Sequence, residues 1–246
     1  MYEERAALLD GAVLWTVTAR PAARPPRPVL PDGCMDLIWA DGHLLVAGPD
    51  TRAHVPGESA ARYAGLRFAP GDAPAVLGVP ARELRDRRIA LDDLWGAAEA
   101  RRLAERITAA PDPARALDAL VRRRAADTEP PDPLMRAVAA RLAAGRTVAD
   151  TAEAVGLGAR QLHRRSLDAF GYGPKTLARI LRLRRALALV LAGVPQAEAA
   201  VRAGCADQAH LARETRALAG MTVGDYTASV SANSETPDPS GSRTTA

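Results

Sequence analysis

The stretch Gly173–Ala192, GPKTLARILRLRRALALVLA, predicts one helix around which the rest of the chain is arranged. Pro174 suits the first turn, where its missing N–H costs nothing, and Gly193 stands where a helix is expected to stop. Apolar side chains recur between them at three- and four-residue intervals: Leu177, Ile180, Leu181, Leu183, Leu187 and Val190. A helix of about 18 residues is roughly 27 Å long.

The two flanks of this rod repeat one pattern. Thr147–Gly171 and Pro195–Gly220 each contain a short Ala-rich helix, a glycine turn at Gly156 or Gly204, and a second helix with Arg, Gln and His. Each flank therefore predicts a helix-turn-helix motif. Successive major-groove faces of B-DNA are about 34 Å apart, so the rod plus the flanking helices has a suitable length to place two recognition helices in adjacent grooves.

The charge of the chain is concentrated in the same region. The formal net charge is +4, but residues 1–133 hold 18 Arg against 20 Asp and Glu, whereas residues 134–227 hold 14 Lys and Arg against 7 Asp and Glu. A basic helical domain beside a slightly acidic half is the electrostatic footprint expected of a part that contacts phosphates. The alternative is an ordinary solvated basic face.

Two sets of side chains are the candidates for reading DNA. They lie on the second helix of each pair, on the sides that the inward-facing Leu162 and Leu211 leave exposed, and Arg and Gln suit guanine and adenine edges. The predicted site residues are Arg160, Gln161, His163, Arg164, Arg165, Gln208, Ala209, His210, Ala212 and Arg213. Thr147 or Asp150 is expected to cap the first helix of the first pair, and Asp207 the second helix of the second.

The segments Leu157–Leu177 and Gly204–Tyr226 resemble the DNA-binding domain of the AraC/XylS family of bacterial transcription regulators, within a match that covers about Leu134–Thr227. The resemblance implies seven helices, with two lying in successive major grooves. It also implies DNA-facing positions at Arg160, His163, Arg164, Gln208, Ala209, His210 and Arg213. The chain departs from the family at Ser166 and Thr215, where phenylalanine is usual.

The first 95 residues predict short strands separated by turns. The strand-like runs are Ala12–Ala19, Met35–Trp39, His43–Val46 and Arg62–Phe68. Asp41-Gly42 is a two-residue hairpin signal. Such short strands favour a small barrel or sandwich. LPDGCMDLIW (Leu30–Trp39) resembles part of an N-terminal domain found in actinobacterial regulators of this family, which implies a cupin-like sensing or dimerising module.

Helical segments are expected from residue 73 onward. They are Ala73–Leu77, Ala81–Arg85, Leu91–Trp95, Ala97–Ala109 and Pro113–Arg124, followed by a Pro-rich acidic linker at Ala125–Pro133 and a helix at Leu134–Ala144. Helices 97–109 and 113–124 either form a dimer seam or pack on the β-rich part, and packing is favoured. The polar sequence after Tyr226 is expected to be disordered.

The predicted fold class is therefore α+β: a small β-rich, cupin-like N-terminal domain, linker helices and an all-α domain with two helix-turn-helix motifs. The expected domains are residues 1–127 for sensing or dimerisation and 134–228 for DNA binding, with a disordered tail at 229–246.

The predicted function is sequence-specific, DNA-binding transcription regulation, with an effector acting through the N-terminal domain. An enzyme is not expected, nor is a cofactor. The partners are double-stranded DNA, contacted at two adjacent major-groove segments, and a small-molecule effector. RNA polymerase and the oligomeric state are left open. No signal peptide or membrane span is evident, and the two cysteines suit a reduced cytoplasm.

The alternative is a metal-binding cupin-like enzyme or sensor fused to a non-specific DNA-binding module. Cys34, His43 and His54, with Asp32 or Asp36, would be its metal ligands, but their spacing is not diagnostic. A non-specific binder needs basic charge without base-reading side chains, and the Gln and His residues of the two predicted recognition helices argue against it.

Overall fold

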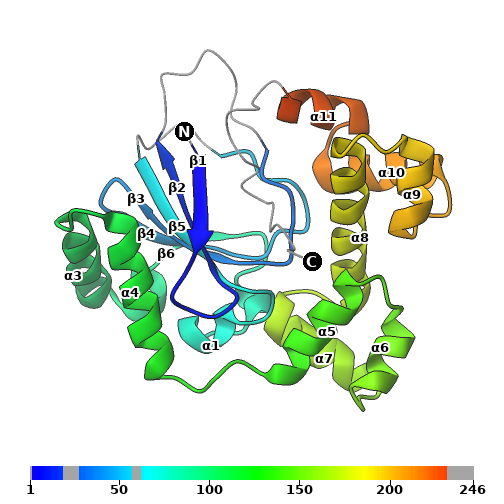
Figure 1. Cartoon of the computed structure of the whole chain (residues 1–246). Helices are drawn as coiled ribbons and strands as arrows, with labels where there is room; N and C mark the ends of the chain where they lie inside the picture. Colours follow the sequence, from blue (N-terminus) through cyan, green and yellow to red (C-terminus); the bar gives the residue numbers. More distant parts are fainter. Residues whose placement is uncertain (1, 19–27, 57–61, 232–246) are drawn as a thin grey trace.

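The computed structural model describes residues 2–18, 28–56 and 62–231 of the chain. Figure 1 shows a sheet with helices on one side in the N-terminal half and a helical region around one upright helix in the C-terminal half. Each half has its own cluster of buried apolar residues. The proposed division at residues 127 and 134 stays a prediction.

One six-stranded sheet forms the N-terminal half, with the linear strand order β1-β2-β5-β3-β4-β6. Every neighbouring pair is antiparallel. The strands are β1 (Tyr2–Ala6), β2 (Val13–Thr18), β3 (Asp36–Ala40), β4 (His43–Ala47), β5 (Arg62–Arg67) and β6 (Arg88–Ala90). Within the described residues the sheet is open, so the expected barrel or sandwich is replaced by a single layer of strands.

The four predicted strands are confirmed to within one or two residues, and so is the hairpin between β3 and β4. Asp41 and Gly42 have φ values of 40° and 96°, and a two-residue turn of this type needs positive φ at both positions. The sequence interpretation missed β1 and β6. Their patterns are weak, because β1 buries only Tyr2 and β6 has three residues.

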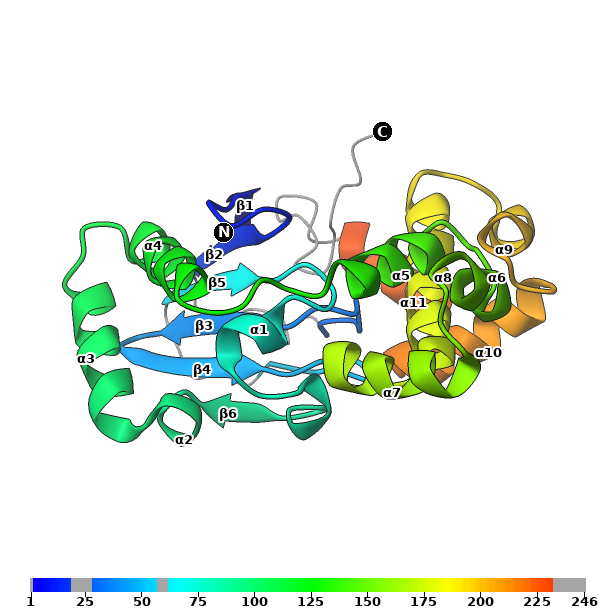
Figure 2. The same ribbon diagram turned by 90° about the horizontal axis from the view of Figure 1, so that it is seen from below.

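The two faces of the sheet have different neighbours because side chains alternate along a strand. Leu14, Leu37, Trp39 and Leu66 point to the helix-covered face and are at most 2% exposed. The covering helices are α1 (Ala73–Leu77), α3 (Ala97–Thr108) and α4 (Pro113–Ala126), with η1 (Ala81–Glu83) and α2 (Asp92–Trp95) at the edges (Figure 2). Helices α3 and α4 therefore pack on the sheet, as favoured from the sequence.

Seven helices follow among the described residues, as the resemblance implies. They are α5 (Pro133–Ala143), α6 (Val148–Ala154), α7 (Ala159–Phe170), α8 (Pro174–Leu191), α9 (Gln196–Ala203), α10 (Gln208–Ala219) and α11 (Val223–Ser231). The expectation of disorder directly after Tyr226 is wrong for residues 227–231. Val230 packs against the apolar cluster and the Ser229 hydroxyl donates to the Tyr226 carbonyl, so α11 continues. Residues 232–246 of the predicted tail lie outside the described residues.

The two halves are joined by more than the linker. Leu30, from the N-terminal half, belongs to the buried cluster of the C-terminal helices. Asp72, with 1% of its side chain exposed, accepts two hydrogen bonds from Arg136 on α5 at 2.9 and 2.7 Å. The backbone of Ala53 donates to the Leu218 carbonyl on α10 at 2.7 Å. These contacts fix the sheet against the helical half.

None of the helices in the described ranges combines the length and apolar character needed to cross a bilayer.

Candidate nucleic-acid interface

Helix α8 is the predicted rod, and its 18 residues match the predicted length. It buries a stripe of side chains spaced three or four residues apart, including Leu177, Ile180, Leu183 and Leu187. The pairs α6–α7 and α9–α10 lie at its two ends (Figure 1). Because both pairs pack on one continuous helix, their separation is set by the length of α8.

Arg185 connects the rod to α5 and to α9 at once. Its guanidinium donates to the carbonyls of Leu142 and Ala143, at the end of α5, at 3.0 and 2.6 Å. It also donates to the Ala203 carbonyl at the end of α9, at 3.0 Å. Helix C-termini carry unpaired carbonyls and partial negative charge, which a cation satisfies. One side chain therefore joins the helix that precedes the first pair to the leading helix of the second pair.

Glu214 fixes α10 to the rod. Its carboxylate accepts hydrogen bonds from Arg179 at 3.0 Å through both oxygens, and Arg182 lies 3.4 Å away. Burial alone would raise the pKa of Glu214, but the hydrogen bonds from Arg179 and the positive charges around it hold the pKa below its ordinary value. Glu214 therefore stays ionised and takes up Arg179 and Arg182, leaving them less available for DNA phosphates.

The first candidate recognition helix, α7, follows α6. Thr147 caps the N-terminus of α6, because its hydroxyl accepts from the Asp150 backbone at 3.1 Å. Leu162 is buried and the four predicted side chains beside it are exposed: Arg160, Gln161, His163 and Arg164. The His163 ring packs on the backbone of Gly173, where a Cβ atom would lie 2.7 Å from the imidazole. Only glycine at residue 173 leaves room for that ring.

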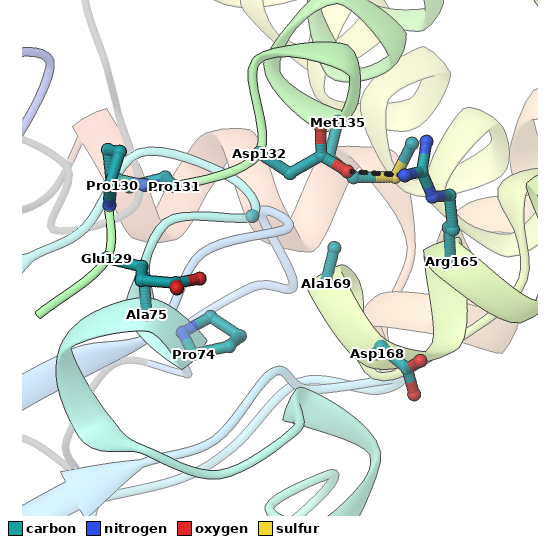
Figure 3. Close-up of a pocket in the computed structure, with 11 residues that line it drawn as sticks. Pro74, Ala75, Glu129, Pro130, Pro131, Asp132, Met135, Arg165, Asp168 and Ala169 are labelled. Atoms are coloured by element: carbon teal, nitrogen blue, oxygen red, sulfur yellow. Dashed lines mark ion pairs between the residues drawn. The ribbon is translucent and has the colours of Figure 1, made fainter.

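Arg165 is placed differently from the other predicted residues of α7. It lies in a groove of about 360 Å³ between α7 and the linker, 3.8 Å from the carboxylate of Asp132 (Figure 3). Asp132 also caps α5, accepting from the Leu134 backbone at 2.9 Å. The structure therefore turns Arg165 toward the linker.

The second candidate recognition helix, α10, begins at the predicted cap. The Asp207 carboxylate accepts from the His210 backbone at 2.6 Å. Gln208, Ala209 and Arg213 are exposed, whereas His210 and Ala212 are half-buried. His210 Nδ1 accepts from the Ala206 backbone at 3.2 Å, so this ring also stabilises the turn.

The two recognition helices lie on one side of the rod. Figure 1 places α7 and α10 near its opposite ends, and the view along α8 in Figure 2 places both on the same side of it. Arg160, Arg164 and Arg213 form no ion pair with any residue in the described ranges. The two helices therefore carry three arginines that are not engaged in ion pairs within the described ranges.

The N-terminal half contacts the opposite end of α7. Arg82 pairs with Asp168, and Phe170 packs against Gly71. The first turns of α7, which carry Arg160 and Arg164, remain exposed. The arrangement therefore holds α7 by its C-terminal half and leaves its N-terminal half open.

Most residues of the alternative metal site line one cavity, but in the described part of the chain they are not arranged to hold a metal ion. Cys34 and His54 line one cavity, but His43 begins β4 at the hairpin and is not among the lining residues. Within the described ranges, no group of three His, Cys, Asp or Glu side chains is arranged to hold a metal ion. Asp32 and Asp36 instead lie 3.4 and 3.6 Å from the guanidinium of Arg67.

Two residues of consequence were missed by sequence reasoning. Arg185 looked like one of several basic residues on the rod, and Arg67 like a strand end. The available signal for a buried ion cluster was a charged residue, Arg67, within the strand-like run RYAGLRF, together with the acidic residues of PDGCMD.

Two models of known protein families match this chain. An AraC-type model described as a helix-turn-helix domain matches residues 136–229, which contain all the predicted site residues. Residues 136–229 therefore match an AraC-type helix-turn-helix domain. A second model, described as a domain of unknown function (DUF6597), matches residues 12–90 of this AraC-type chain. The protein is therefore an AraC-type DNA-binding transcription regulator.

Solved structures of ToxT from Vibrio cholerae align with most of this chain. An apo variant aligns over 88% of this chain and 96% of its own, with 10% identity and a TM-score of 0.46. ToxT bound to an unsaturated fatty acid aligns over 92% and 97%, with 11% identity and a TM-score of 0.45. Among proteins of curated function, none matches the sequence of this chain.

Proposed function

We propose that this AraC-type regulator binds a specific site of about 20 base pairs, placing the first turns of α7 and α10 in two consecutive major grooves. The observation that carries the proposal is the position of two recognition helices on one side of an 18-residue rod, with their first turns exposed. The rod spans about 27 Å, and the helices packed on its ends extend this toward one turn of B-DNA.

The proposed base-reading set combines exposed and half-buried residues. In the first groove these are Arg160, Gln161, His163 and Arg164, and in the second Gln208, Ala209, His210, Ala212 and Arg213. The arginines suit guanine or phosphate, and the glutamines suit adenine. Arg165 is proposed as a phosphate contact that first has to leave Asp132.

The N-terminal half is proposed to regulate this binding in response to a small-molecule effector. The contacts that support this are those between the halves, above all the buried Asp72–Arg136 pair, since they are the route by which a change at the sheet reaches α5. Catalysis is not part of the proposal. The cytoplasmic location and a contact with RNA polymerase stay predictions.

The decisive experiment is selection of bound fragments from genomic DNA, followed by binding of the selected site and a scrambled duplex at one salt concentration. Arg164→Ala and Arg213→Ala are each expected to weaken binding to the selected site by about 1–3 kcal/mol, with little change for the scrambled duplex, if the residue reads a base. Equal weakening of both duplexes would assign the residue to a phosphate.

The matched control is Arg122→Ala, an exposed arginine on α4 in the other half of the chain. It removes the same charge and should leave both affinities unchanged. Failure of the selection to enrich any sequence, with equal affinity for every duplex, would contradict specific binding and favour the non-specific alternative.

A further inference from the structure

The second face of the sheet borders a cavity of about 330 Å³ that the DNA-binding function does not use. Trp15, Val17, Ile38, Leu45 and Tyr63 give it aromatic and aliphatic walls. Trp15 lies over Gly65, where a Cβ atom would be 2.1 Å from the indole ring. A cavity of this size, mostly apolar with a few charged groups, has the make-up of a small-molecule site.

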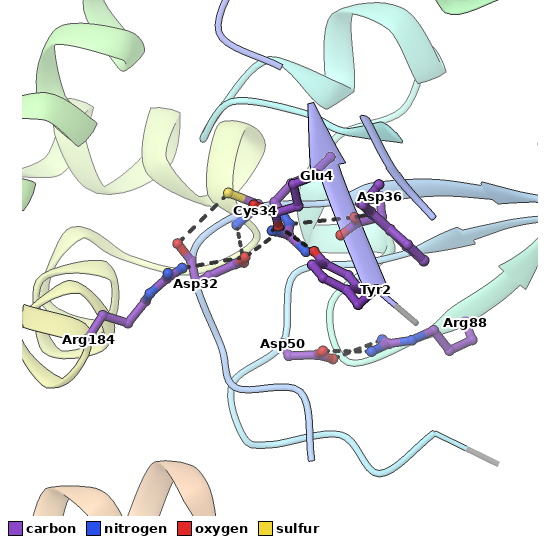
Figure 4. Close-up of polar contacts among 10 residues, drawn as sticks. Tyr2, Glu4, Asp32, Cys34, Asp36, Asp50, Arg88 and Arg184 are labelled. Atoms are coloured by element: carbon purple, nitrogen blue, oxygen red, sulfur yellow. Dashed lines mark hydrogen bonds and ion pairs between the residues drawn. The ribbon is translucent and has the colours of Figure 1, made fainter. Parts of the chain in front are cut away.

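The polar side of the cavity is a buried cluster of ion pairs (Figure 4). Arg67, with 4% of its side chain exposed, lies 3.3 Å from Glu4, 3.4 Å from Asp32 and 3.6 Å from Asp36. The Trp15 indole N–H donates to Asp36 at 2.6 Å. The buried Nε–H of Arg67 meets no acceptor in hydrogen-bond geometry within the described part of the chain, although Asp32 and Asp36 are its ion-pair neighbours.

The charges that line the cavity do not cancel. Among its described lining residues are three carboxylates, Asp32, Asp36 and Asp50, and two guanidiniums, Arg67 and Arg88. Arg88 is paired with Asp50, to which its guanidinium donates two hydrogen bonds at 2.9 and 2.7 Å. Burial and the positive charge of Arg88 lower the pKa of His54, so this residue adds no positive charge near neutral pH. Arg184, outside the lining, lies 3.6 Å from Asp32, and Glu4 lies 3.3 Å from Arg67. The whole cluster therefore holds four carboxylates and three guanidiniums, and one carboxylate has no cation of its own.

The pKa of Asp36 is a consequence of the same imbalance. Burial raises it to about 6; the charge of Arg67 opposes the rise, whereas Asp32 adds to it. An added positive charge at this position would favour the ionised carboxylate. A ligand anion would meet further desolvated negative charge, because both guanidiniums already face carboxylates.

We propose that this cavity binds an organic cation: a protonated amine that faces Asp36 and Asp32, carried on an aromatic or aliphatic body that fills the space between Trp15 and Tyr63. The inference rests on the proposed role of the N-terminal half in sensing an effector, and it names the chemical class of that effector.

The cavity is connected to the rod through Asp32. The Arg184 guanidinium on α8 lies 3.6 Å from the Asp32 carboxylate, which also faces Arg67. Leu30, two residues earlier, lines the cavity and is buried in the apolar cluster of the C-terminal helices. A cation that draws Asp32 into the cavity competes with Arg184, and so loosens a contact between the sheet and the rod.

The test uses three probes with one body and different head groups: 4-phenylbutylamine, 4-phenylbutanol and 4-phenylbutyrate. Calorimetric titration of the full chain at pH 7.5 is expected to give the amine at least about tenfold tighter binding than the alcohol and the acid, a difference of about 1.4 kcal/mol. Equal binding of the three probes, tightest binding of the acid, or no saturable binding of the amine would overturn the proposal.

Three variants locate the site. Asp36→Asn keeps the shape and removes the charge, so it should abolish the preference for the amine, while Leu45→Trp should fill the cavity and abolish binding of all three probes. Asp93→Asn, an exposed carboxylate on α2, is the charge-matched control and should bind like the parent chain. If Asp36→Asn fails to fold, Asp32→Asn replaces it, with the same loss expected because Asp32 is the second carboxylate that faces the amine. Unchanged amine preference in a folded site variant would contradict the assignment.

The connection to the rod has its own readout. The amine should change the affinity of the parent chain for its selected DNA site, and Arg184→Gln should abolish that change while amine affinity is retained. Amine affinity is measured without DNA, so its loss counts against this inference alone. Loss of specific DNA binding with intact amine affinity counts against the proposed function alone.

Discussion

At the residue scale, two buried hydroxyl groups in equivalent places have different surroundings. Ser166 on α7 and Thr215 on α10 are both fully buried, at the positions where the family resemblance expects phenylalanine. The Thr215 hydroxyl donates to the Leu211 carbonyl at 2.8 Å, whereas the Ser166 hydroxyl has no partner among the described residues. A buried polar atom without a partner costs stability, and one with a partner does not.

Ser166→Ala is therefore expected to leave the free energy of unfolding unchanged or to raise it by about 1 kcal/mol, because it removes an unpaired group. Thr215→Val, which deletes a satisfied hydroxyl, is expected to lower it by about 1 kcal/mol. Urea denaturation of the full chain measures both. A loss in Ser166→Ala as large as that in Thr215→Val would show that the Ser166 hydroxyl is hydrogen-bonded in solution.

Asp36 makes a pH-dependent contribution whose sign follows from its pKa. Its pKa is about 6 in the folded chain against 3.8 as the ordinary value, so the folded chain holds more protons between these limits. Stability from this group is consequently lost as the pH rises from about 4 to 6. Asp36→Asn is expected to remove a change of up to about 3 kcal/mol between urea denaturation at pH 4 and at pH 6.5. Parallel pH profiles for the two proteins would contradict it.

At the scale of elements, α8 is the feature on which the C-terminal half depends, and Arg185 is its most connected side chain. Burial and the neighbouring charge of Arg182 lower the pKa of Arg185, but an arginine remains protonated at neutral pH. The cation can thus serve the carbonyls at the ends of α5 and α9 under ordinary conditions.

Arg185→Ala is expected to lower stability by about 2 kcal/mol, because three carbonyls lose a charged donor. It should also speed amide exchange in the last turns of α5 and α9 and weaken binding to the selected DNA site. Lys175→Ala, an exposed cation on the same helix, is the control and should change neither stability nor exchange. Unchanged exchange at both helix ends in Arg185→Ala would rule out the bridging role.

Helices and strands were predictable from the sequence where the local residue pattern agrees with the observed fold. The predicted helix Gly173–Ala192 agrees with α8 to within one residue at each end, and Asp207 caps α10 as expected. Tyr2–Ala6 could not be recognised, because its strand character comes from pairing with β2 and not from its own alternation. The contacts of Arg165 with the linker and of Arg67 with three acids depend on residues distant in sequence, which periodicity does not reveal.

At the scale of the whole molecule, a few polar pairs connect the sheet to the helical half, and the two side chains of a pair are buried to different extents. Asp72 is almost fully buried, and its partner Arg136 is 39% exposed. Burial raises the pKa of Asp72, and the hydrogen bond from Arg136 offsets part of that rise. The carboxylate therefore depends on Arg136 to remain charged between the halves.

Arg136→Ala is expected to destabilise the chain by about 2–3 kcal/mol because it leaves the Asp72 carboxylate buried without its partner. Asp72→Ala with Arg136→Ala should cost less than the sum of the two single changes, which a double-mutant cycle by urea denaturation measures. Additive costs would mean that the two side chains do not interact in solution, and that the halves are held by other contacts.

The contacts that Arg185 makes from the rod to the ends of α5 and α9 have a consequence for the DNA sites that this protein is proposed to bind. A rigid spacer requires a fixed rotational position of the two half-sites as well as a fixed base sequence. One inserted base pair turns the second half of an operator by about 35° around the duplex axis. Promoters should therefore vary more in base sequence than in the number of base pairs between the two half-sites.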